Sequence, residues 1–432
     1  GRSGPRPPAR HLRPDHLMTH AHTASTGAQP LAGLLVLDLG QMYNGSYCGM
    51  LMALHGARVI KIEPPTGEAL RLRAGSPGAK LPLYLVNSGK KALSIDLRSD
   101  RGREIFLELV RKADVLIENF APGTMDRLGL GPERLLRENP RLVYGASTGY
   151  GEGGSFARYP AMDLTIQAMT GTMATTGTAE SGPLKTGPAG ADFLCGVHLL
   201  SAILMALLQR GITGRGQRLE VAMADAVIPS LASSIAFYLG MGQEPPRTGN
   251  RHSGLAYAPY NVYAAADGHL AIFCVRDEHW VDLCNVMEQP ALATDARFRT
   301  IASRVEHMDA VDETVGGWVR MFTRSEAFDR LMVRQVPSAP VKNISEVLHE
   351  PHFRQRGAVV PLDHPVMGSL LVLGSPIHLS EAAPLPPSPA PELGQHNREI
   401  LGELLGMSGD EVDALEDAGV LGPPRTATAQ PA

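Results

Sequence analysis

The acidic residue with the clearest chemical potential is Asp192, which lies in the segment GADFLCGVH over residues 190–198. The mostly apolar residues after it predict a long helix over 193–210. An aspartate at such a helix start is usually a cap that accepts backbone N–H groups. A helix N-terminus also stabilises negative charge by about 0.3–1 kcal/mol, so an ionised Asp192 could instead attack a carbonyl carbon. The residues alone leave both interpretations open.

Three further features could contribute to a site. Asp163 also precedes an apolar run and is expected to cap a helix, and His198 is expected to be a core residue of the long helix rather than a catalytic base. The run GYGEGG at 149–154 resembles a phosphate-binding loop. However, the first βα turn, GQMYNG at 40–45, lacks the GxGxxG pattern of dinucleotide sites. We therefore expect 149–154 to be a flexible loop at the ligand-binding edge of a sheet.

Alternating short strands and helices must position these side chains. A buried strand over 34–39 is followed by Asn-Gly, by Ser46 as a predicted N-cap of a helix to residue 54, and by a strand over 58–62. The same alternation continues along the chain, with helices at 101–112 and 132–138 and strands at 114–118, 142–146 and 217–223. This pattern predicts an α/β fold with a parallel sheet.

We divide the chain into four segments. Residues 1–30 are rich in proline and arginine and are expected to be a disordered extension, with a transit peptide as the alternative. Residues 31–227 form the first part of a large domain, 228–330 a smaller α+β domain, and 331–432 the return to the large domain with C-terminal helices. The small domain is expected to contain a hairpin over 260–275 that turns at Asp267-Gly268. A helix is predicted over 225–239, and the glycine-rich run 211–216 is expected to be a non-helical turn.

Composition excludes several classes of function. The 432 residues carry a formal charge of −4, which argues against nucleic acid or an anionic membrane as a partner. The longest apolar stretch, 193–208, is shorter than the roughly 20 residues that a membrane crossing needs. Four widely spaced cysteines without a CxxC pattern predict neither disulfides nor a metal site. We expect a cytoplasmic protein with reduced thiols.

Several stretches together carry a resemblance to a known family. They are LDL at 37–39 with Gly45, GARVIKIE at 56–63, residues 87–97, ADVLIENFAPG at 113–123, TGRGQ at 213–217, the hairpin with Asp267-Gly268, and LGQH at 393–396. Over residues 31–422 the sequence resembles the class III CoA-transferase family, which includes formyl-CoA and carnitine CoA-transferases and is related to α-methylacyl-CoA racemase.

The resemblance implies a Rossmann-like large domain with a smaller inserted α+β domain, assembled as an interlocked homodimer. It implies that Asp192 is the catalytic aspartate. It also implies that the CoA and acyl groups are bound by Asn119, Phe120, Arg127, Arg98, Tyr43 and Asn44, with Met42 and the segment 247–260 shaping the acyl site. Because Tyr43 and Asn44 differ from formyl-CoA transferase, oxalate and formate are not the expected substrates.

The implied activity moves CoA between an acyl-CoA and a free carboxylic acid through an aspartyl anhydride and an aspartyl-CoA thioester. Coenzyme A is then a substrate, and neither a metal nor a redox cofactor is needed. One alternative is an α-methylacyl-CoA racemase or another acyl-CoA isomerase. In racemases a histidine precedes the position of Asp163, whereas Met162 stands here and cannot move a proton. The other alternative is a CoA-binding protein without catalysis.

Overall fold

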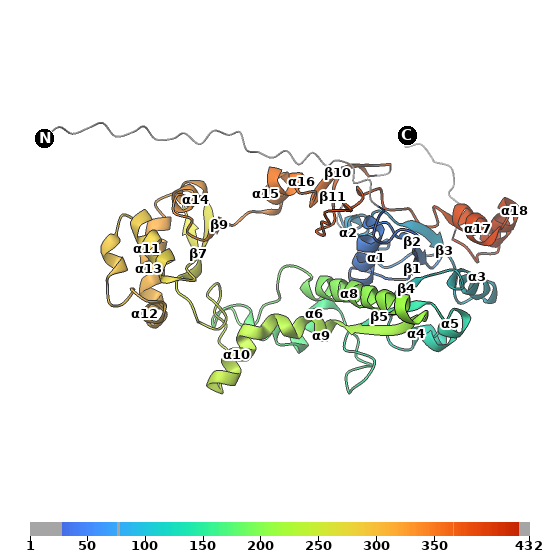
Figure 1. Ribbon diagram of the computed structural model, residues 1–432, viewed down its shortest axis with the longest axis horizontal. Helices are drawn as coiled ribbons and strands as arrows, with labels where there is room; N and C mark the ends of the chain where they lie inside the picture. Colours follow the sequence, from blue (N-terminus) through green and yellow to red (C-terminus); the bar gives the residue numbers. More distant parts are fainter. Residues whose placement is uncertain (1–27, 76–77, 366, 423–432) are drawn as a thin grey trace.

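The computed structural model of the protein describes residues 28–75, 78–365 and 367–422 (Figure 1). The predicted extension over 1–30 therefore lies almost wholly outside the described residues. At the centre of the large domain is a six-stranded sheet with the order β3-β2-β1-β4-β5-β6, and every pair of neighbours is parallel. The strands are β1 (Leu35–Asp38), β2 (Arg58–Glu63), β3 (Lys91–Ser94), β4 (Val115–Glu118), β5 (Val143–Thr148) and β6 (Gln217–Ala222). The predicted α/β class with a parallel sheet is confirmed.

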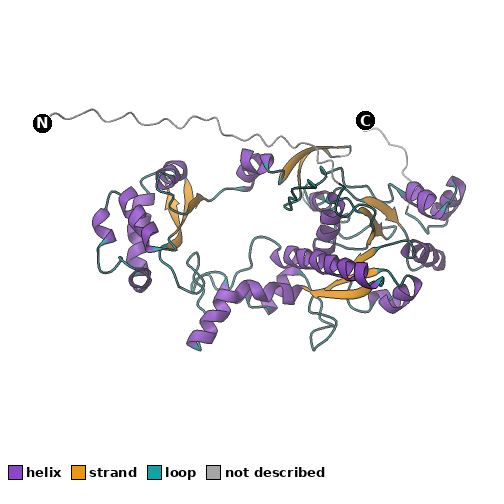
Figure 2. Cartoon of the chain, viewed as in Figure 1, coloured by secondary structure: helices purple, strands orange, loops and turns teal. Residues whose placement is uncertain are grey.

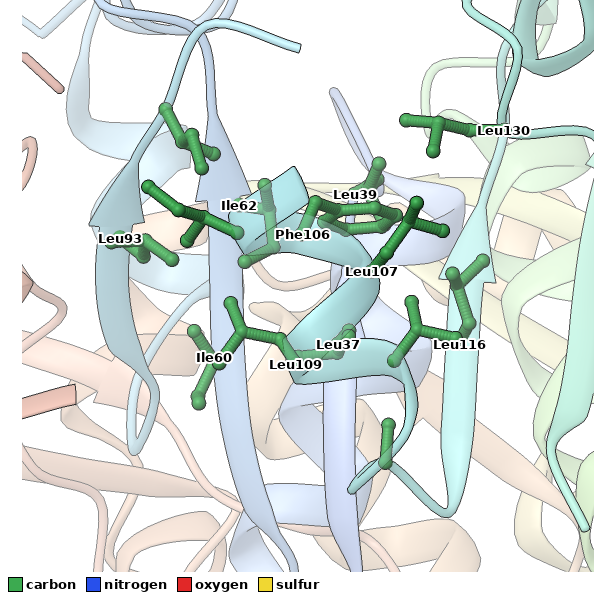
Figure 3. Close-up of a cluster of buried hydrophobic side chains, with 14 of the residues drawn as sticks. Leu37, Leu39, Ile60, Ile62, Leu93, Phe106, Leu107, Leu109, Leu116 and Leu130 are labelled. Atoms are coloured by element: carbon green, nitrogen blue, oxygen red, sulfur yellow. The ribbon is translucent and has the colours of Figure 1, made fainter. Parts of the chain in front are cut away.

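Side chains alternate between the two faces of this sheet, and helices bury both faces. On one face Leu37 and Leu116 pack with Phe106 and Leu109 of α3, in the cluster that Figure 3 shows. The C-terminal helices complete the same cluster with Ile400, Leu401 and Val412. The helices on this face are α3 (Asp100–Val110), α5 (Pro132–Glu138), α17 (Asn397–Leu405) and α18 (Gly409–Asp417).

The opposite face of the sheet is covered by two helices. Val36 and Ile117 pack there against Leu51 of α1 (Asn44–Leu54) and Ile203 of α8 (Gly190–Thr213). Val36 and its neighbour Leu37 thus contribute to two different cores, as expected from the alternation of side chains along a strand.

The start of α1 differs from the prediction. The helix begins at Asn44, with Tyr43 at its cap position, so the prediction of Ser46 as the N-cap is wrong. The Ser46 hydroxyl donates instead to the carbonyl of Gly40 at 3.2 Å. This side chain therefore ties the helix to the loop that follows β1.

The small unit lies apart from the sheet (Figures 1 and 2). Its antiparallel strands β7 (Tyr260–Ala265), β8 (Gly268–Phe273) and β9 (Ser338–Pro340) pack with α11 (Asp277–Val286), α12 (Ile301–Glu306), α13 (Met308–Val319) and α14 (Arg324–Met332). The hairpin predicted at Asp267-Gly268 is observed between β7 and β8. The core of the unit extends from Ala258 to Val336, and β9 pairs with β8, so its packing begins after residue 228 and continues past residue 330.

Two separate connections join the small and large units. One runs through α9 (Met223–Val227), η1 (Ile228–Leu231) and α10 (Ala232–Met241), and the other runs through α15 (Ile344–His349) and α16 (Pro351–Gln355) to the hairpin of β10 (Val359–His364) and β11 (Gly368–Leu373). The ribbon therefore traces an open ring (Figure 1). The remaining helices are α2 (Leu81–Val86), α4 (Thr124–Arg127), α6 (Asp163–Met169), α7 (Thr172–Thr175) and η2 (Pro290–Ala293).

Two expectations about helices are corrected. The glycine-rich run 211–216 is not wholly a turn, because α8 continues to Thr213 and ends at Gly214, whose φ of 72° suits glycine. The predicted helix over 225–239 is divided into three pieces around Pro229, which lacks the N–H that a continuous α-helix needs.

The helix α8 is also longer than the apolar stretch seen in the sequence. By length and composition, the helical runs Gly190–Thr213 and Met223–Met241 could each cross a membrane. In the structure α8 packs against the sheet through residues such as Leu199 and Ile203. Its Arg210 is buried and pairs with Asp114, with 3.0 Å between Nη2 and Oδ1. The apolar side chains on this side of α8 are therefore those of a helix that covers a sheet.

Candidate active site

A cavity of about 710 Å³ lies where β1, β4 and β5 end. The chain leaves β1 toward β2 on one side, while β4 and β5 lie on its other side. The strand order therefore reverses at β1. Open parallel sheets bind ligands at such a switch point, beyond the carboxyl ends of the strands. The loop after β1 contributes Gln41 and Met42 to the wall, the first residue of α1 contributes Asn44, and the loop after β4 contributes residues 119–123.

Asp192 lines this cavity from the third position of α8. The residue is 8% exposed, and no hydrogen bond to its carboxylate is found within the described part of the chain. Ala189 occupies the cap position, so the interpretation of Asp192 as the N-cap is wrong. Burial raises the pKa of Asp192 to about 7, and the negative charge of Asp163 adds to the shift. The effect of burial thus exceeds the stabilisation expected from the helix N-terminus.

Asp163 caps α8 from another element. It is the first residue of α6, and its Oδ1 accepts the backbone N–H of Ala191 at 2.9 Å. Its Oδ2 accepts Nε2 of Gln167 at 2.6 Å. A carboxylate from 28 residues away therefore accepts a backbone N–H in the first turn of α8, so the carboxylate of Asp192 does not have to cap this helix.

Asn119 joins the two loops at the switch point. Its Oδ1 accepts the N–H of Gln41 at 2.7 Å, and its Nδ2 donates to the Gln41 carbonyl at 2.9 Å and to Oδ1 of Asn44 at 2.7 Å. The preceding carboxylate, Glu118, accepts the N–H of Phe120 at 2.7 Å and the hydroxyl of Tyr144 at 3.1 Å. Both loops that form the wall are therefore fixed through their backbones.

Four of the residues expected at a CoA site line the cavity together with Asp192, namely Asn44, Asn119, Phe120 and Arg127. Arg127 is exposed and donates to the hydroxyl of Thr124 at 2.8 Å. Arg158 is a second exposed cation in the lining, and neither arginine pairs with a carboxylate in the described residues. Sequence reasoning missed Arg158, for which the only signal is a basic side chain shortly after the glycine-rich run.

Other expected residues lie outside the lining. Tyr43 stacks on Phe193, with 5.8 Å between ring centroids, and its hydroxyl accepts Nη1 of Arg73 at 3.2 Å. Arg98 is exposed in the loop between β3 and α3. None of the residues 247–260 lines the cavity in this chain, and Arg251 there pairs with Asp309 and Asp312.

His198 is not a core residue, because it is exposed on α8 and its Nδ1 lies 2.8 Å from the carbonyl oxygen of Leu194. It does not line the cavity either. Met162 does line it, at the start of α6. The lining contains no histidine and no lysine, and the described residues hold no group of three or more His, Cys, Asp or Glu side chains that could bind a metal. Among the lining residues, the buried carboxyl of Asp192 is thus the group best placed for covalent chemistry.

A doubly wound parallel sheet with a ligand cavity and a buried carboxyl group at its switch point defines an α/β protein of the Rossmann-like class. Residues 31–397 match the model of CoA-transferase family III, and the chain belongs to this family. The class III CoA-transferase resemblance is confirmed.

Relatives and solved structures agree with this membership. A succinyl-CoA:mesaconate CoA-transferase of Haloarcula hispanica is 36% identical over 86% of this chain and 96% of its own. A formyl-CoA:oxalate CoA-transferase of Streptomyces coelicolor is 33% identical over 91% of this chain and 100% of its own. The crystal structure of a CAIB/BAIF family protein from Brucella suis matches with a TM-score of 0.78 and 33% identity, and covers 87% of this chain and 100% of that one.

Proposed function

We propose that the protein moves CoA between an acyl-CoA thioester and a free carboxylic acid, with Asp192 as the nucleophile. The observation that carries this proposal is a buried carboxyl group that faces a ligand cavity and forms no hydrogen bond within the described residues. The relatives named above are CoA-transferases whose names specify different acids. We therefore propose a carboxylate acceptor without naming the acid.

The first half of the reaction frees CoA. A carboxylate oxygen of Asp192 attacks the thioester carbonyl carbon, the C–S bond breaks, and a mixed anhydride and CoA thiolate form. The thiolate then attacks the aspartyl carbonyl carbon. The acyl group leaves as a carboxylate, and CoA is held as an aspartyl thioester.

The second half repeats these steps in reverse with the acceptor acid. Its carboxylate attacks the aspartyl thioester, which forms a new anhydride and releases thiolate. The thiolate attacks the acceptor's acyl carbon and regenerates the carboxylate of Asp192. No proton is gained or lost overall, which suits a cavity whose described lining residues include neither histidine nor lysine. The cycle as proposed uses neither a metal nor a redox cofactor.

CoA is proposed to bind along the loops after β4 and β5. Arg127 and Arg158 are exposed cations that can pair with phosphate oxygens, since arginine binds phosphate through two parallel hydrogen bonds. Phe120 can cover the adenine ring. Met162, which cannot accept or deliver a proton, supports group transfer over racemisation. Arg98 and Tyr43 would need to contact CoA or the acyl group outside the cavity described.

We further propose that the protein is a homodimer in the cytoplasm. Apolar side chains of α8 and α10 are uncovered in the single chain: Leu208 is 74% exposed, Ile212 89%, Leu239 76% and Met241 62%. Exposed apolar surface of this kind is typical of an interface. A second copy threaded through the open ring could cover these helices. The four cysteines are free and buried, which is consistent with a reducing compartment.

The nucleophile can be tested by trapping. With succinyl-CoA as donor and a panel of carboxylic acids, mass spectrometry should detect new acyl-CoA products. Hydroxylamine added during turnover should convert Asp192 to a hydroxamate, because it attacks the activated aspartyl carbonyl. Asp192→Asn keeps the shape of the side chain and should give neither the product nor the adduct. Full activity in Asp192→Ala, or a hydroxamate on another residue, would refute this role.

A further inference from the structure

The segment over 40–44, which contributes Gln41, Met42 and Asn44 to one wall of the cavity, is held by several buried and part-buried polar contacts. Gly40 donates its N–H to Oδ1 of Asp38 at 2.8 Å, and its carbonyl accepts Nζ of Lys61 at 3.0 Å. Gln41 is bound through both its backbone groups by Asn119. Met42 donates its N–H to Oε2 of Glu68 at 2.8 Å. Both backbone groups of Gly40 and of Gln41, and the N–H of Met42, therefore have partners within the protein.

The contact to Met42 comes from a buried ion pair. Nζ of Lys61 lies 2.6 Å from Oε1 of Glu68, and the two side chains are 0% and 1% exposed. Burial acts to lower the pKa of Lys61, but attraction to Glu68 and its acidic neighbours outweighs burial and raises it. One oxygen of Glu68 is thus close to the cation, and the other is directed to the loop.

Met42 has a backbone conformation that needs such support. Its φ is 57°, in the left-handed region that few residues other than glycine adopt. A buried charge pair is also expensive to form unless its geometry is good, and apolar residues of similar size often stabilise a fold as well. A strained lining residue beside a buried ion pair indicates a role in shaping the cavity rather than in overall stability.

We propose that Glu68 is a positioning residue: its carboxylate, balanced by Lys61, holds Met42 in the left-handed conformation and thereby fixes the wall of the cavity. No contact between Glu68 and substrate is implied, and Glu68 itself does not line the cavity. The effect of Glu68 on CoA binding rests on the proposed function, whereas its effect on the loop does not.

The test compares Glu68→Gln with a matched variant elsewhere in the large domain. Asp114 pairs with Arg210 and accepts the N–H of Leu35 at 2.9 Å, so Asp114→Asn also breaks a largely buried ion pair but does not touch the cavity. In hydrogen–deuterium exchange of the full chain, Glu68→Gln should accelerate exchange in the peptide 40–46. Asp114→Asn should leave this peptide as in the wild type.

A second variant addresses the risk that an unpaired lysine prevents folding. In Lys61→Met/Glu68→Leu both charges of the pair are removed together, so no unpaired lysine is buried, while Met42 loses its acceptor and the carbonyl of Gly40 loses its donor. This variant should show the same faster exchange in 40–46. Unchanged exchange in both Glu68 variants, or equal acceleration in Asp114→Asn, would overturn the proposal.

Calorimetry with CoA supplies the functional measurement. Glu68→Gln should bind CoA about tenfold more weakly, and its KM for acyl-CoA should rise more than its kcat falls. Asp114→Asn should match the wild type in CoA affinity and in its kinetic constants. If wild-type protein neither binds CoA nor transfers it, the proposed function fails, while the exchange data still decide the role of Glu68.

Discussion

Replacing Asp192 with asparagine should make the protein more stable as well as inactive. The native state retains the proton of Asp192 up to about pH 7, whereas the unfolded chain releases it near 3.8. Between these values the folded state binds more protons, so this group lowers stability as the pH rises. The gap of about three pH units between the two pKa values corresponds to a loss of roughly 4 kcal/mol in the free energy of unfolding. This loss is complete above pH 7 and absent below pH 4. Asparagine cannot ionise, so the variant does not lose this stability as the pH rises.

Urea unfolding followed by circular dichroism at pH 5 and pH 8 can measure this effect. The free energy of unfolding of Asp192→Asn should exceed that of the wild type by a margin that grows by about 3 kcal/mol between the two pH values. Asp225 is exposed, so Asp225→Asn makes the same charge change and should show no such growth. If the free energies of unfolding of Asp192→Asn and the wild type change by the same amount between pH 5 and pH 8, the carboxyl of Asp192 is not a buried acid with a raised pKa.

Two further predictions concern the same site. The rate of transfer should rise with pH through a midpoint near 7 as Asp192 ionises. Asp163→Asn should move this midpoint downward, because it removes the negative charge that is the second cause of the raised pKa of Asp192. An unmoved midpoint would mean that Asp163 does not act on Asp192. Gly196→Ala should weaken CoA binding and lower the free energy of unfolding by about 1–3 kcal/mol, because the new Cβ would lie 2.7 Å from the carbonyl oxygen of Asn44. Gly211→Ala, in open space on the same helix, should be neutral or stabilising. Calorimetry with CoA and urea unfolding measure both variants, and a Gly211→Ala protein less stable than Gly196→Ala would contradict the prediction.

Much of the fold follows from local patterns. The helix predicted over 132–138 coincides with α5, and the strands predicted before and after it correspond to β1, β2, β4, β5 and β6 of the sheet. The local pattern does not predict β3, because KALS is short and begins with lysine. It does not predict the hairpin of β10 and β11 either, since Pro361 lies within it and a proline usually argues against a strand.

The site is only partly predictable for a different reason. Asp192 can be singled out by its place at a helix start, but its freedom from capping depends on Asp163, whose contact forms only in the folded chain. The direction of its pKa shift does not follow from the sequence, because burial is a tertiary property that a helix N-terminus offsets only slightly. Likewise, nothing around Glu68 in the sequence predicts that it reaches Met42, since the contact depends on how the loops fold back.

The C-terminal helices have a consequence for biosynthesis. Ile400 and Leu401 complete the core over β1–β4, and Leu421 forms a bridge with Ile95 at the edge of the sheet. The first strands to leave the ribosome therefore cannot close their core until almost the whole polypeptide, including the small unit, has been made. The part of that face that α17 and α18 cover therefore stays open in the nascent chain, beside the part that α3 already covers, and we expect it to need protection from aggregation during that time.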